Sequence, residues 1–302
     1  MGDVREVCVA EDSGDSIARL RPGTLFLVAT PIGNLGDLSP RGRDLLRDAG
    51  LLLAEDTRHT AQLLHAVGVQ RPPGTLESLH EHNERDRVTK VIERLRAGTS
   101  VALASDAGTP LVSDPGAALV TAAAAAGIEV IAVPGPCAAI AALTLAALPT
   151  ARFAFEGFLP ARPVARREAL ESLAAESRTL VFYEAPHRLR ESLDDLTAVF
   201  GAARPAAVAR ELTKKFESVY RGTLGTLAQQ AATDADMSRG EIVLVVQGAA
   251  RETSVDDAEA DRVLRVLLEE MPVSQAARIA AELTGRPRKA LYERALRLRP
   301  QV

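Results

Sequence analysis

Tryptophan is absent from this sequence and aromatic side chains of any kind are rare, which limits both the core and the surface. Aromatic residues make up 3% of the 302 residues, whereas hydrophobic residues as a whole make up 47%. Cores of ordinary size must therefore be built from alanine, valine, leucine and isoleucine. Platforms on which bases of a single-stranded nucleic acid could stack are correspondingly scarce.

Cysteine and long apolar runs are also lacking. The two cysteines, Cys8 and Cys137, exclude a disulfide framework, and they have no metal-ligand spacing. His80 and His82 in LHEHNE are interpreted as polar loop residues at the start of a helix rather than as metal ligands. No apolar run has the length of a membrane span and the N-terminus is too acidic for a signal peptide. We therefore expect a cytoplasmic protein with no metal and no membrane contact.

Cationic side chains are too few to dominate the molecule, since the net charge is −4. This balance opposes nucleic-acid binding as a whole, because phosphates are neutralised by clustered cations. The cations are unevenly distributed, however. The segment 284–299, TGRPRKALYERALRLR, contains six cationic residues and one acidic residue, and RPVARR at 162–167 forms a second cluster.

Apolar segments of strand-like composition alternate with helical segments in the first half of the chain. The expected strands are TLFLVAT (24–30), LLLAEDT (51–57), VALAS (101–105) and VIAV (130–133). The first expected helix begins near Ser39, where Pro40 suits a first helical turn. Strands that alternate with helices predict a parallel sheet covered on both faces, so residues 23–149 are interpreted as an α/β domain.

The pattern changes after Pro149. The strand-like segments that follow are more closely spaced: FAFEGF, TLVFYEA, AAVARELT, ESVYRGT and EIVLVVQG. They predict a second α/β domain with a mixed sheet over residues 150–249. Residues 250–302 are expected to form a linker and a small helical region, in which Ser274 is a plausible N-cap. Residues 1–22 are expected to form a loose N-terminal extension.

The last expected helix, 286–299, has two interpretations of equal weight. Its cations could dock on rRNA, or it could be a solvated helix that packs on the body of the protein through Leu291, Ala295 and Leu298. The sequence does not decide between them.

Turn-rich loops follow four of the expected strands in the first domain. They are TPIGNLGD (30–37), EDTRHT (55–60), SDAGTPLVSDPG (105–116) and PGPCA (134–138). Loops at the carboxyl ends of parallel strands meet at one edge of the sheet, where they form a ligand crevice. Neither GxGxxG after the first strand nor GxxxxGK[ST] occurs, which disfavours a dinucleotide enzyme and a P-loop NTPase.

These segments also carry a resemblance to a known family. LFLVATPIGNLGDLSPRGRDLL, LLLAEDTRHTAQLL, LHEHNE, VALASDAGTPLVSDPG, VPGPCAAIAAL, FAFEGFLP, TLVFYEAPHRL, VARELTKKFESVYRGTL and GEIVLVV resemble the ribosomal RNA small subunit methyltransferase I family, over residues 24–247. The resemblance implies the two-domain tetrapyrrole methylase fold, with S-adenosylmethionine held in a cleft between the domains. It further implies 2′-O-methylation of a cytidine ribose in the decoding region of 16S rRNA in the small ribosomal subunit, by a homodimer.

The resemblance implies a set of residues near the cofactor. They are Asp106, Gly108, Thr109, Pro110, Pro136, Cys137, Ala138, Tyr183, Glu184, Arg210, Glu211 and Gly240. A carboxylate such as Asp106 can pair with the ammonium group of the cofactor. Tyr183 has an alternative interpretation as a half-buried aromatic residue at the end of a strand.

Catalysis would consist of in-line attack by a ribose hydroxyl, for which alignment supplies most of the acceleration. Glu55 or Asp56 is the expected base, and Lys214 the expected cation that steers an alkoxide or phosphate. Asp56 could instead cap a helix, and the Lys214–Lys215 pair could simply be solvated. The expected RNA contacts are Pro31, Gly33, Asn34, Arg58, His59, Arg188 and Lys215.

Two other functions remain open at this point. One is methylation of a small molecule of the tetrapyrrole type by the same fold, and the other is a non-catalytic protein that binds the cofactor or RNA. Arginine, lysine and histidine in LHEHNE, YEAPHR and ARELTK favour an RNA substrate.

Overall fold

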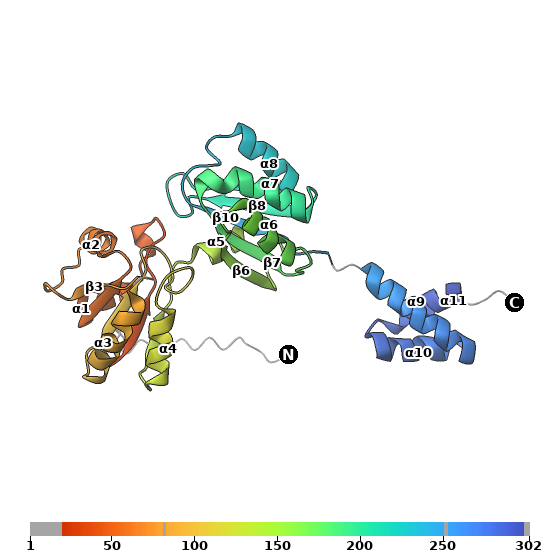
Figure 1. The fold of residues 1–302 in the computed structure, drawn as a ribbon, viewed down its shortest axis with the longest axis horizontal. Coiled ribbons are helices and arrows are strands. Elements are labelled where there is room, and N and C mark those ends of the chain that lie inside the picture. Colours follow the sequence, from red (N-terminus) through yellow and green to blue (C-terminus); the bar gives the residue numbers. More distant parts are fainter. Residues whose placement is uncertain (1–19, 81–82, 251–252, 299–302) are drawn as a thin grey trace. The chain divides into compact units, whose positions relative to one another are not determined.

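The chain forms two compact units, Met1–Gly248 and Ala249–Val302. The computed structural model describes residues 20–80, 83–250 and 253–298. The larger unit contains two five-stranded sheets, and the smaller one is helical (Figure 1). The extension expected over residues 1–22 lies outside the described residues as far as position 19.

The first sheet is parallel throughout, as the alternating pattern predicts, and its strand order is β3-β2-β4-β1-β5. Its strands are β1 (Leu25–Val28), β2 (Leu51–Ala54), β3 (Leu76–Ser78), β4 (Val101–Ala104) and β5 (Val130–Val133). Every residue of β2 and β4 is buried, because helices cover both faces of a parallel sheet.

Four helices cover the two faces of this sheet in pairs. The helices α1 (Pro40–Asp48) and α2 (Thr57–Ala66) pack on one face, and α3 (Glu84–Arg96) and α4 (Ala117–Ala125) pack on the other. The helix α1 begins as predicted, since the Ser39 hydroxyl accepts the Gly42 N–H at 3.0 Å and Pro40 occupies the first turn.

The arrangement of these helices creates a topological switch point. The strands β1 and β4 are neighbours, but the helices that follow them lie on opposite faces of the sheet. The loops after β1 and β4 therefore diverge and leave a crevice at the carboxyl edge, which is where open α/β sheets bind ligands.

The second sheet is mixed, with the strand order β6-β7-β10-β8-β9. Its strands are β6 (Phe153–Phe158), β7 (Thr179–Glu184), β8 (Pro205–Arg210), β9 (Ser218–Thr223) and β10 (Ile242–Val246). The pair β6–β7 is parallel, whereas the β7–β10, β10–β8 and β8–β9 pairs are antiparallel.

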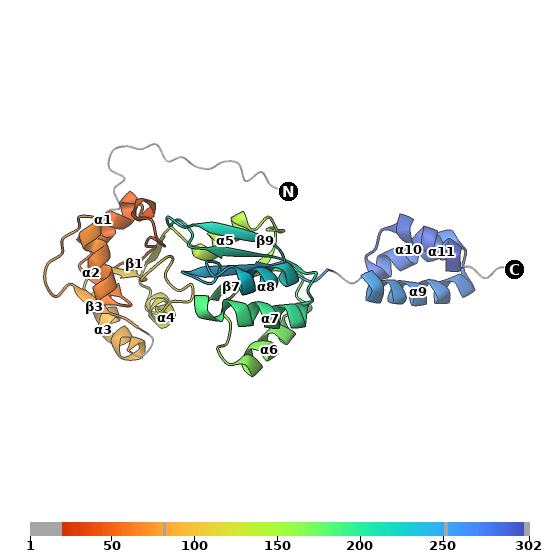
Figure 2. The same cartoon turned by 90° about the horizontal axis from the view of Figure 1, so that it is seen from above.

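Helices bury both faces of the second sheet as well. Leu180 and Phe182 of β7 pack toward α6 (Pro163–Ser172), α7 (Leu189–Phe200) and α8 (Leu224–Thr233), whereas Val181 faces α5 (Ala138–Leu145). This alternation follows from the two-residue period of a strand. Figure 2 shows α5 on one side of the sheet and α6 and α7 on the other. The helix α5 thus packs on the second sheet although it precedes Pro149 in the sequence.

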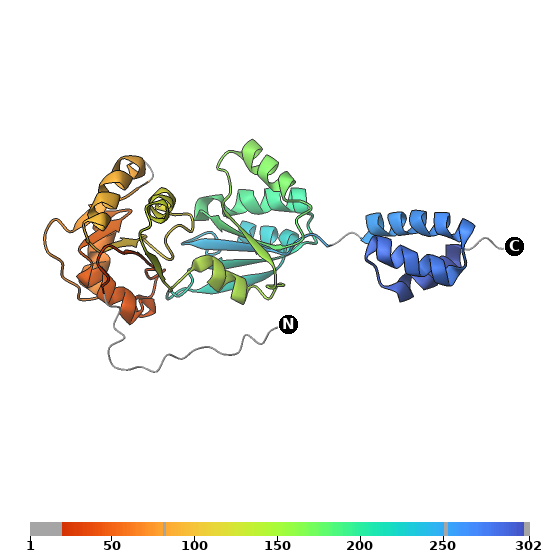
Figure 3. The same cartoon turned by 90° about the horizontal axis from the view of Figure 1, so that it is seen from below.

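The smaller unit consists of α9 (Thr253–Glu270), α10 (Val273–Thr284) and α11 (Arg288–Leu298), drawn in blue in Figure 3. The helix α11 buries Leu291 and Ala295 against the other two helices, with Leu298 partly buried beside them. The predicted buried face of this helix is confirmed, and its partners are α9 and α10 of the same unit. Its exposed face carries Arg288, Lys289 and Arg297, so cations are still presented to solvent. Across the described parts of the chain, no helix is long and apolar enough to cross a membrane.

Candidate functional site

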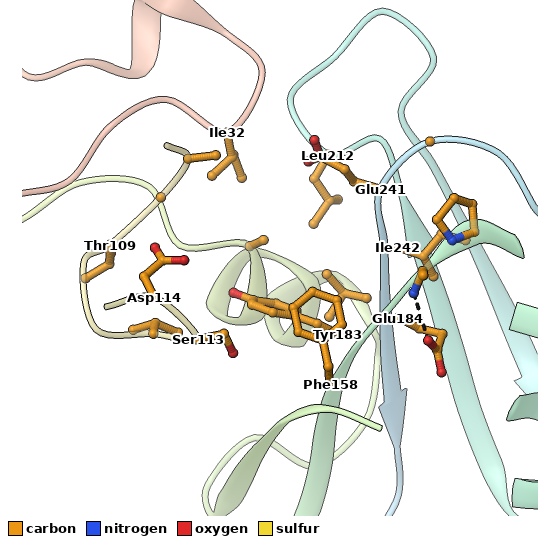
Figure 4. Close-up of a pocket in the computed structure, with 18 residues that line it drawn as sticks. Ile32, Thr109, Ser113, Asp114, Phe158, Tyr183, Glu184, Leu212, Glu241 and Ile242 are labelled. Carbon is orange, nitrogen blue, oxygen red and sulfur yellow. Dashed lines mark hydrogen bonds between the residues drawn. The ribbon is translucent and has the colours of Figure 1, made fainter. Parts of the chain in front are cut away.

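A pocket of about 290 Å³ lies beside the switch point of the first sheet, where loops from both sheets meet (Figure 4). The first domain supplies Ile32 after β1, residues 107–109 and 112–114 after β4, and Ala138 at the start of α5. The second domain supplies Phe158, Tyr183, Leu212 and the segment 240–243. This volume is at the small end of the range of about 300–1,000 Å³ for pockets that bind small molecules.

The loops after β1 and β4 are hydrogen-bonded to each other below this pocket. The Thr30 and Gly108 backbones form a two-bond bridge, with N–O distances of 2.9 and 3.1 Å. The Thr30 hydroxyl donates to the Ser105 carbonyl at 3.1 Å, and the Ser105 hydroxyl donates to the Gly108 carbonyl at 2.9 Å. Gly108 has a φ of 92°, which side-chain-bearing residues rarely adopt, so glycine is required at this crossing.

Unusual backbone geometry is concentrated in two loops beside the pocket. Leu111 and Ser113 have φ values of 74° and 66°, and Glu211 and Thr213 have values of 52° and 66°. Such conformations cost on the order of 1–3 kcal/mol each and persist where surrounding contacts fix them. Both loops are therefore held in defined shapes next to the pocket.

Asp114 is the carboxylate that the first domain places on the pocket wall, and Glu184 and Glu241 line it from the second domain (Figure 4). Burial, together with the negative charges of Glu55 and Asp106, raises its pKa to about 6, although a hydrogen bond from Ser105 opposes the shift. Among the residues that the structure describes, no cationic side chain pairs with Asp114, and a partly buried carboxylate of this kind favours binding of a positively charged group. Asp114 was not among the expected site residues, although it belongs to the same SDAGTPLVSDPG loop as the expected Asp106.

Asp106 does not lie on the pocket wall. Its Oδ1 atom accepts the Asp56 N–H at 3.1 Å, and its Oδ2 atom lies 2.9 Å from Nδ1 of His59. The hydrogen bond and the charge of Asp106 raise the pKa of His59. Asp106 therefore joins the loops after β2 and β4, and its expected pairing with a cofactor ammonium group stays a prediction.

The two expected bases differ in their surroundings. Asp56 is the N-cap of α2: its carboxylate accepts the Arg58 N–H at 2.8 Å and pairs with the Arg58 guanidinium at 2.6 Å. These hydrogen bonds hold the pKa of Asp56 far below its usual value, so the helix-capping interpretation is confirmed. Burial and the nearby Asp106 raise the pKa of Glu55 instead. Glu55 is consequently the stronger base of the two at neutral pH.

Tyr183 and Glu184 both line the pocket at the end of β7. Tyr183 is half-buried, with edge-on contacts to Phe155 and Phe158 at centroid distances of 4.9 and 5.5 Å. Burial, followed by the proximity of Cys137, raises the pKa of its hydroxyl. The buried Glu184 carboxylate accepts the Ala185 N–H at 2.8 Å and also contacts Ser192 and Arg188, so it holds the turn after β7.

Arg188, an expected RNA contact, and Arg210, an expected cofactor contact, both direct their side chains into the protein. Arg188 donates to the carbonyls of Leu159 and Pro160, which ties the end of β6 to the turn after β7. Arg210 is 9% exposed and donates to the Phe216 carbonyl at 2.6 Å. Both side chains thus fix loops around the pocket through the terminal nitrogens of their guanidinium groups.

Lys214 lies against the loop after β1, which brings two expected site residues together. A Cβ atom on Gly33 would approach Cγ of Lys214 to 2.3 Å. The Lys214 ammonium group contacts Glu211 at 3.0 Å and Glu241 at 3.1 Å. Burial alone would lower the pKa of Lys214, but these ion pairs raise it, so the cation is retained. Glu211 also packs on Gly240, where an added Cβ atom would come within 2.3 Å of Oε1.

The remaining expected residues fall into three groups: some line the pocket, some support its wall, and some lie on the protein surface. Gly108, Thr109, Ala138 and Gly240 line the pocket, whereas Pro110, Pro136, Cys137 and Glu211 lie outside its lining. Thr109 supports the wall by donating to the Pro136 carbonyl at 2.9 Å, and Asn34 caps the short helix Leu35–Asp37. Pro31 is partly exposed, and Gly33, Arg58, His59 and Lys215 are exposed. The lining residues that were not among the expected site residues are chiefly Ile32, Ser113, Asp114, Phe158 and Leu212, and each lies within one of the quoted segments.

No group of histidine, cysteine, aspartate and glutamate that could hold a metal ion occurs within residues 20–80, 83–250 and 253–298. His80 precedes α3, where its backbone N–H donates to the Asn83 side chain at 2.9 Å. His82 lies outside the described residues.

Comparison with known proteins identifies the class and then the family. The family profile of the tetrapyrrole (corrin/porphyrin) methylases matches residues 24–228, and the profile of the RsmI C-terminal HTH domain matches residues 254–299. The two joined α/β domains thus form a tetrapyrrole methylase fold. The chain belongs to the ribosomal RNA small subunit methyltransferase I family.

The similarity to members of this family extends over almost the whole chain. Ribosomal RNA small subunit methyltransferase I of Xylella fastidiosa (strain Temecula1) is 58% identical over 90% of this chain and 98% of the relative. The Pseudomonas aeruginosa protein of the same name is 52% identical over 91% of this chain and 97% of the relative. Among solved structures, the methyltransferase CobJ shares the fold, with a TM-score of 0.54 and 22% identity over 76% of this chain and 95% of that one.

Proposed function

We propose that this protein transfers a methyl group from S-adenosylmethionine to the ribose 2′-oxygen of a cytidine in the decoding region of 16S rRNA. The observation that carries the proposal is the pocket with the partly buried Asp114 carboxylate at the switch point, in a chain 58% identical to a ribosomal RNA small subunit methyltransferase I. We further propose that it acts in the cytoplasm as a homodimer on the small ribosomal subunit.

The residues of the pocket fit S-adenosylmethionine. Asp114 offers a carboxylate to the ammonium group of the cofactor, in the role that the sequence analysis gave to Asp106. Phe158 and Tyr183 offer aromatic surfaces, and Gly108 and Gly240 let the backbone approach a ligand closely. When bound, the cofactor supplies a methyl group on a positively charged, strongly electrophilic sulfur.

The chain contributes mainly position and environment to the reaction. Ile32 and Leu212 face each other across the pocket and exclude water from its apolar part (Figure 4). Alignment of the hydroxyl with the methyl group can contribute on the order of 7–11 kcal/mol. Glu55, whose pKa is raised, is the proposed acceptor of the hydroxyl proton, and Lys214 is the proposed cation near the developing alkoxide.

The proposed RNA contacts are the exposed cations around the pocket and on α11. Arg58 and His59 expose 84% and 62% of their side chains, and Lys215 is exposed. On α11, Arg288, Lys289 and Arg297 are exposed. Contacts of this kind position the backbone of an RNA without reading its sequence.

Methyl transfer and its position on the RNA test the proposal together. Purified protein is incubated with cofactor labelled in the methyl group and with small ribosomal subunits from cells that lack this enzyme. The expected result is label in 16S rRNA, as a 2′-O-methyl group on one cytidine of the decoding region. Label on a base, label elsewhere in the RNA, or transfer only to a tetrapyrrole would overturn the proposal. Cofactor binding without transfer to any of these acceptors would favour a non-catalytic role.

A further inference from the structure

Phe216 is exposed to an unusual degree for a large aromatic side chain. It lies between β8 and β9 and exposes 63% of its surface. The whole chain contains seven phenylalanines and no tryptophan, so few aromatic side chains are available for an exposed position. The ammonium group of the adjacent Lys215 lies 5.4 Å from the centre of the Phe216 ring. An exposed ring and a cation thus form one contiguous surface.

The loop that carries Phe216 is firmly held. The buried Arg210 guanidinium donates to the Phe216 carbonyl at 2.6 Å, and the Thr213 N–H donates to the Glu217 carboxylate at 2.6 Å. Two non-glycine residues of this loop adopt positive φ angles, which only a well-determined loop maintains. The ring is therefore presented to solvent by a defined structure, and little ordering is required when a ligand binds.

This loop also borders the pocket. Leu212 lines the pocket, and Phe216 follows four residues later, within at most ~14 Å along the chain. Lys214 lies against Gly33 of the opposite loop, so the two loops meet beside the pocket. The loop therefore lies within reach of nucleotides that flank one whose ribose enters the pocket.

We propose that Phe216, with Lys215, is a stacking platform for an unpaired RNA base next to the nucleotide in the pocket. The inference rests on the proposed function, since it assumes that the substrate is RNA. Bases of single-stranded RNA stack on exposed aromatic rings, and a neighbouring cation contacts the phosphate backbone. Removal of the ring is expected to weaken RNA binding about 5- to 150-fold and to leave cofactor binding unchanged.

The absence of tryptophan makes a direct test possible. Phe216→Trp places a single fluorophore at the proposed platform in an otherwise tryptophan-free chain. The variant is titrated with a mixed-sequence 12-nucleotide single-stranded RNA, with the same RNA annealed to its complement, and with unmethylated small ribosomal subunits. Quenching by the single strand and by the subunits, and little quenching by the duplex, is the expected result.

Phe153→Trp is the matched control. Phe153 is 38% exposed and begins β6, whereas Phe158 at the other end of that strand lines the pocket, roughly 17 Å away. The proposal is overturned if neither RNA probe quenches the emission of the Phe216→Trp variant, or if the Phe153→Trp variant responds equally. It is also overturned if the emission of the Phe216→Trp variant changes with protein concentration alone, since the ring would then be buried between two copies of the chain.

Kinetics distinguish stacking from a merely structural role. Phe216→Ala is expected to raise the KM for ribosomal subunits by about 5- to 150-fold, with little change in the Kd for S-adenosylmethionine. Phe216→Trp is expected to keep the KM close to its wild-type value. A parallel loss of cofactor affinity, or no rescue by tryptophan, would contradict the proposal. Failure of the proposed function is distinguishable, because the wild-type protein would then transfer no methyl group to RNA whatever the fluorescence shows.

Discussion

The raised pKa of Asp114 implies that the protein would be more stable without this charge. Burial and the charges of Glu55 and Asp106 raise the pKa from 3.8 to about 6. The folded protein thus binds the Asp114 proton more tightly than the unfolded chain does. Stability falls as the pH rises between these two values, and the loss is complete above about 6. Asp114→Asn removes this loss.

The size of the effect follows from the shift. Each pKa unit corresponds to about 1.4 kcal/mol, so Asp114→Asn should raise the free energy of unfolding at pH 8 by at most ~3 kcal/mol. Solvent at the open side of the pocket screens part of this interaction and reduces the gain. At pH 5 the gain should be about half of its value at pH 8, because the folded protein then already holds the proton.

Urea unfolding at the two pH values measures this gain, and titration calorimetry measures the cost to the cofactor. Loss of one charge-assisted contact of about 1.5–3 kcal/mol should weaken S-adenosylmethionine binding about 10- to 150-fold. The control is Asp37→Asn, which removes a charge from an exposed position outside the pocket lining. An Asp114→Asn variant that is no more stable than wild type at pH 8 would refute the electrostatic reasoning, and unchanged cofactor affinity would refute the proposed role.

Three further predictions concern contacts around the site and in the second domain. Because Asp106 raises the pKa of His59, this pair stabilises the protein fully below the ordinary pKa of 6.5, and the contribution is lost as the pH rises through the raised value. His59→Gln should abolish that part of the pH dependence of thermal unfolding. An unchanged pH profile would contradict this prediction. Gly240→Ala places a Cβ atom against Glu211 at a φ of 75°, so the free energy of unfolding should fall by about 1–2 kcal/mol and cofactor affinity should fall with it. Unchanged stability and affinity would show that the loop adjusts to the added atom without cost. Asp195→Ala leaves the buried Arg166, which is 2% exposed, without its partner at 2.7 Å. Urea unfolding should therefore show that the free energy of unfolding falls by about 3–5 kcal/mol. A decrease below about 1 kcal/mol would mean that Glu191 compensates as the partner of Arg166.

The order of elements in the first domain could be predicted because local pattern and tertiary structure agree there. The strands β1, β2, β4 and β5 lie within the predicted segments, since strands buried on both faces form short apolar runs. The helices α6, α7 and α8 were not among the predicted elements. In the second half, the strand segments are recognisable because they are rich in β-branched and aromatic residues. The helical segments between them are less apolar and therefore gave no clear pattern.

The cap assigned to α10 was wrong in a similar way. Ser274 appeared suited to an N-cap by residue type. The helix begins at Val273 instead, with Pro272 as its N-cap. Residue type states which caps are favourable, but the position of a helix start depends on how the chain turns from the preceding helix.

The sequence by itself determined that loops rich in glycine, proline and aspartate meet at one edge of a parallel sheet, and its motifs indicated the family. Only the tertiary structure decided which aspartate lines the pocket. Asp106 and Asp114 share one loop and one residue type, but Asp106 is engaged by the Asp56 N–H and by His59, whereas Asp114 lies on the pocket wall. The physical reason is that hydrogen-bond partners from distant segments determine which carboxylate is already satisfied, and those partners cannot be inferred from local sequence.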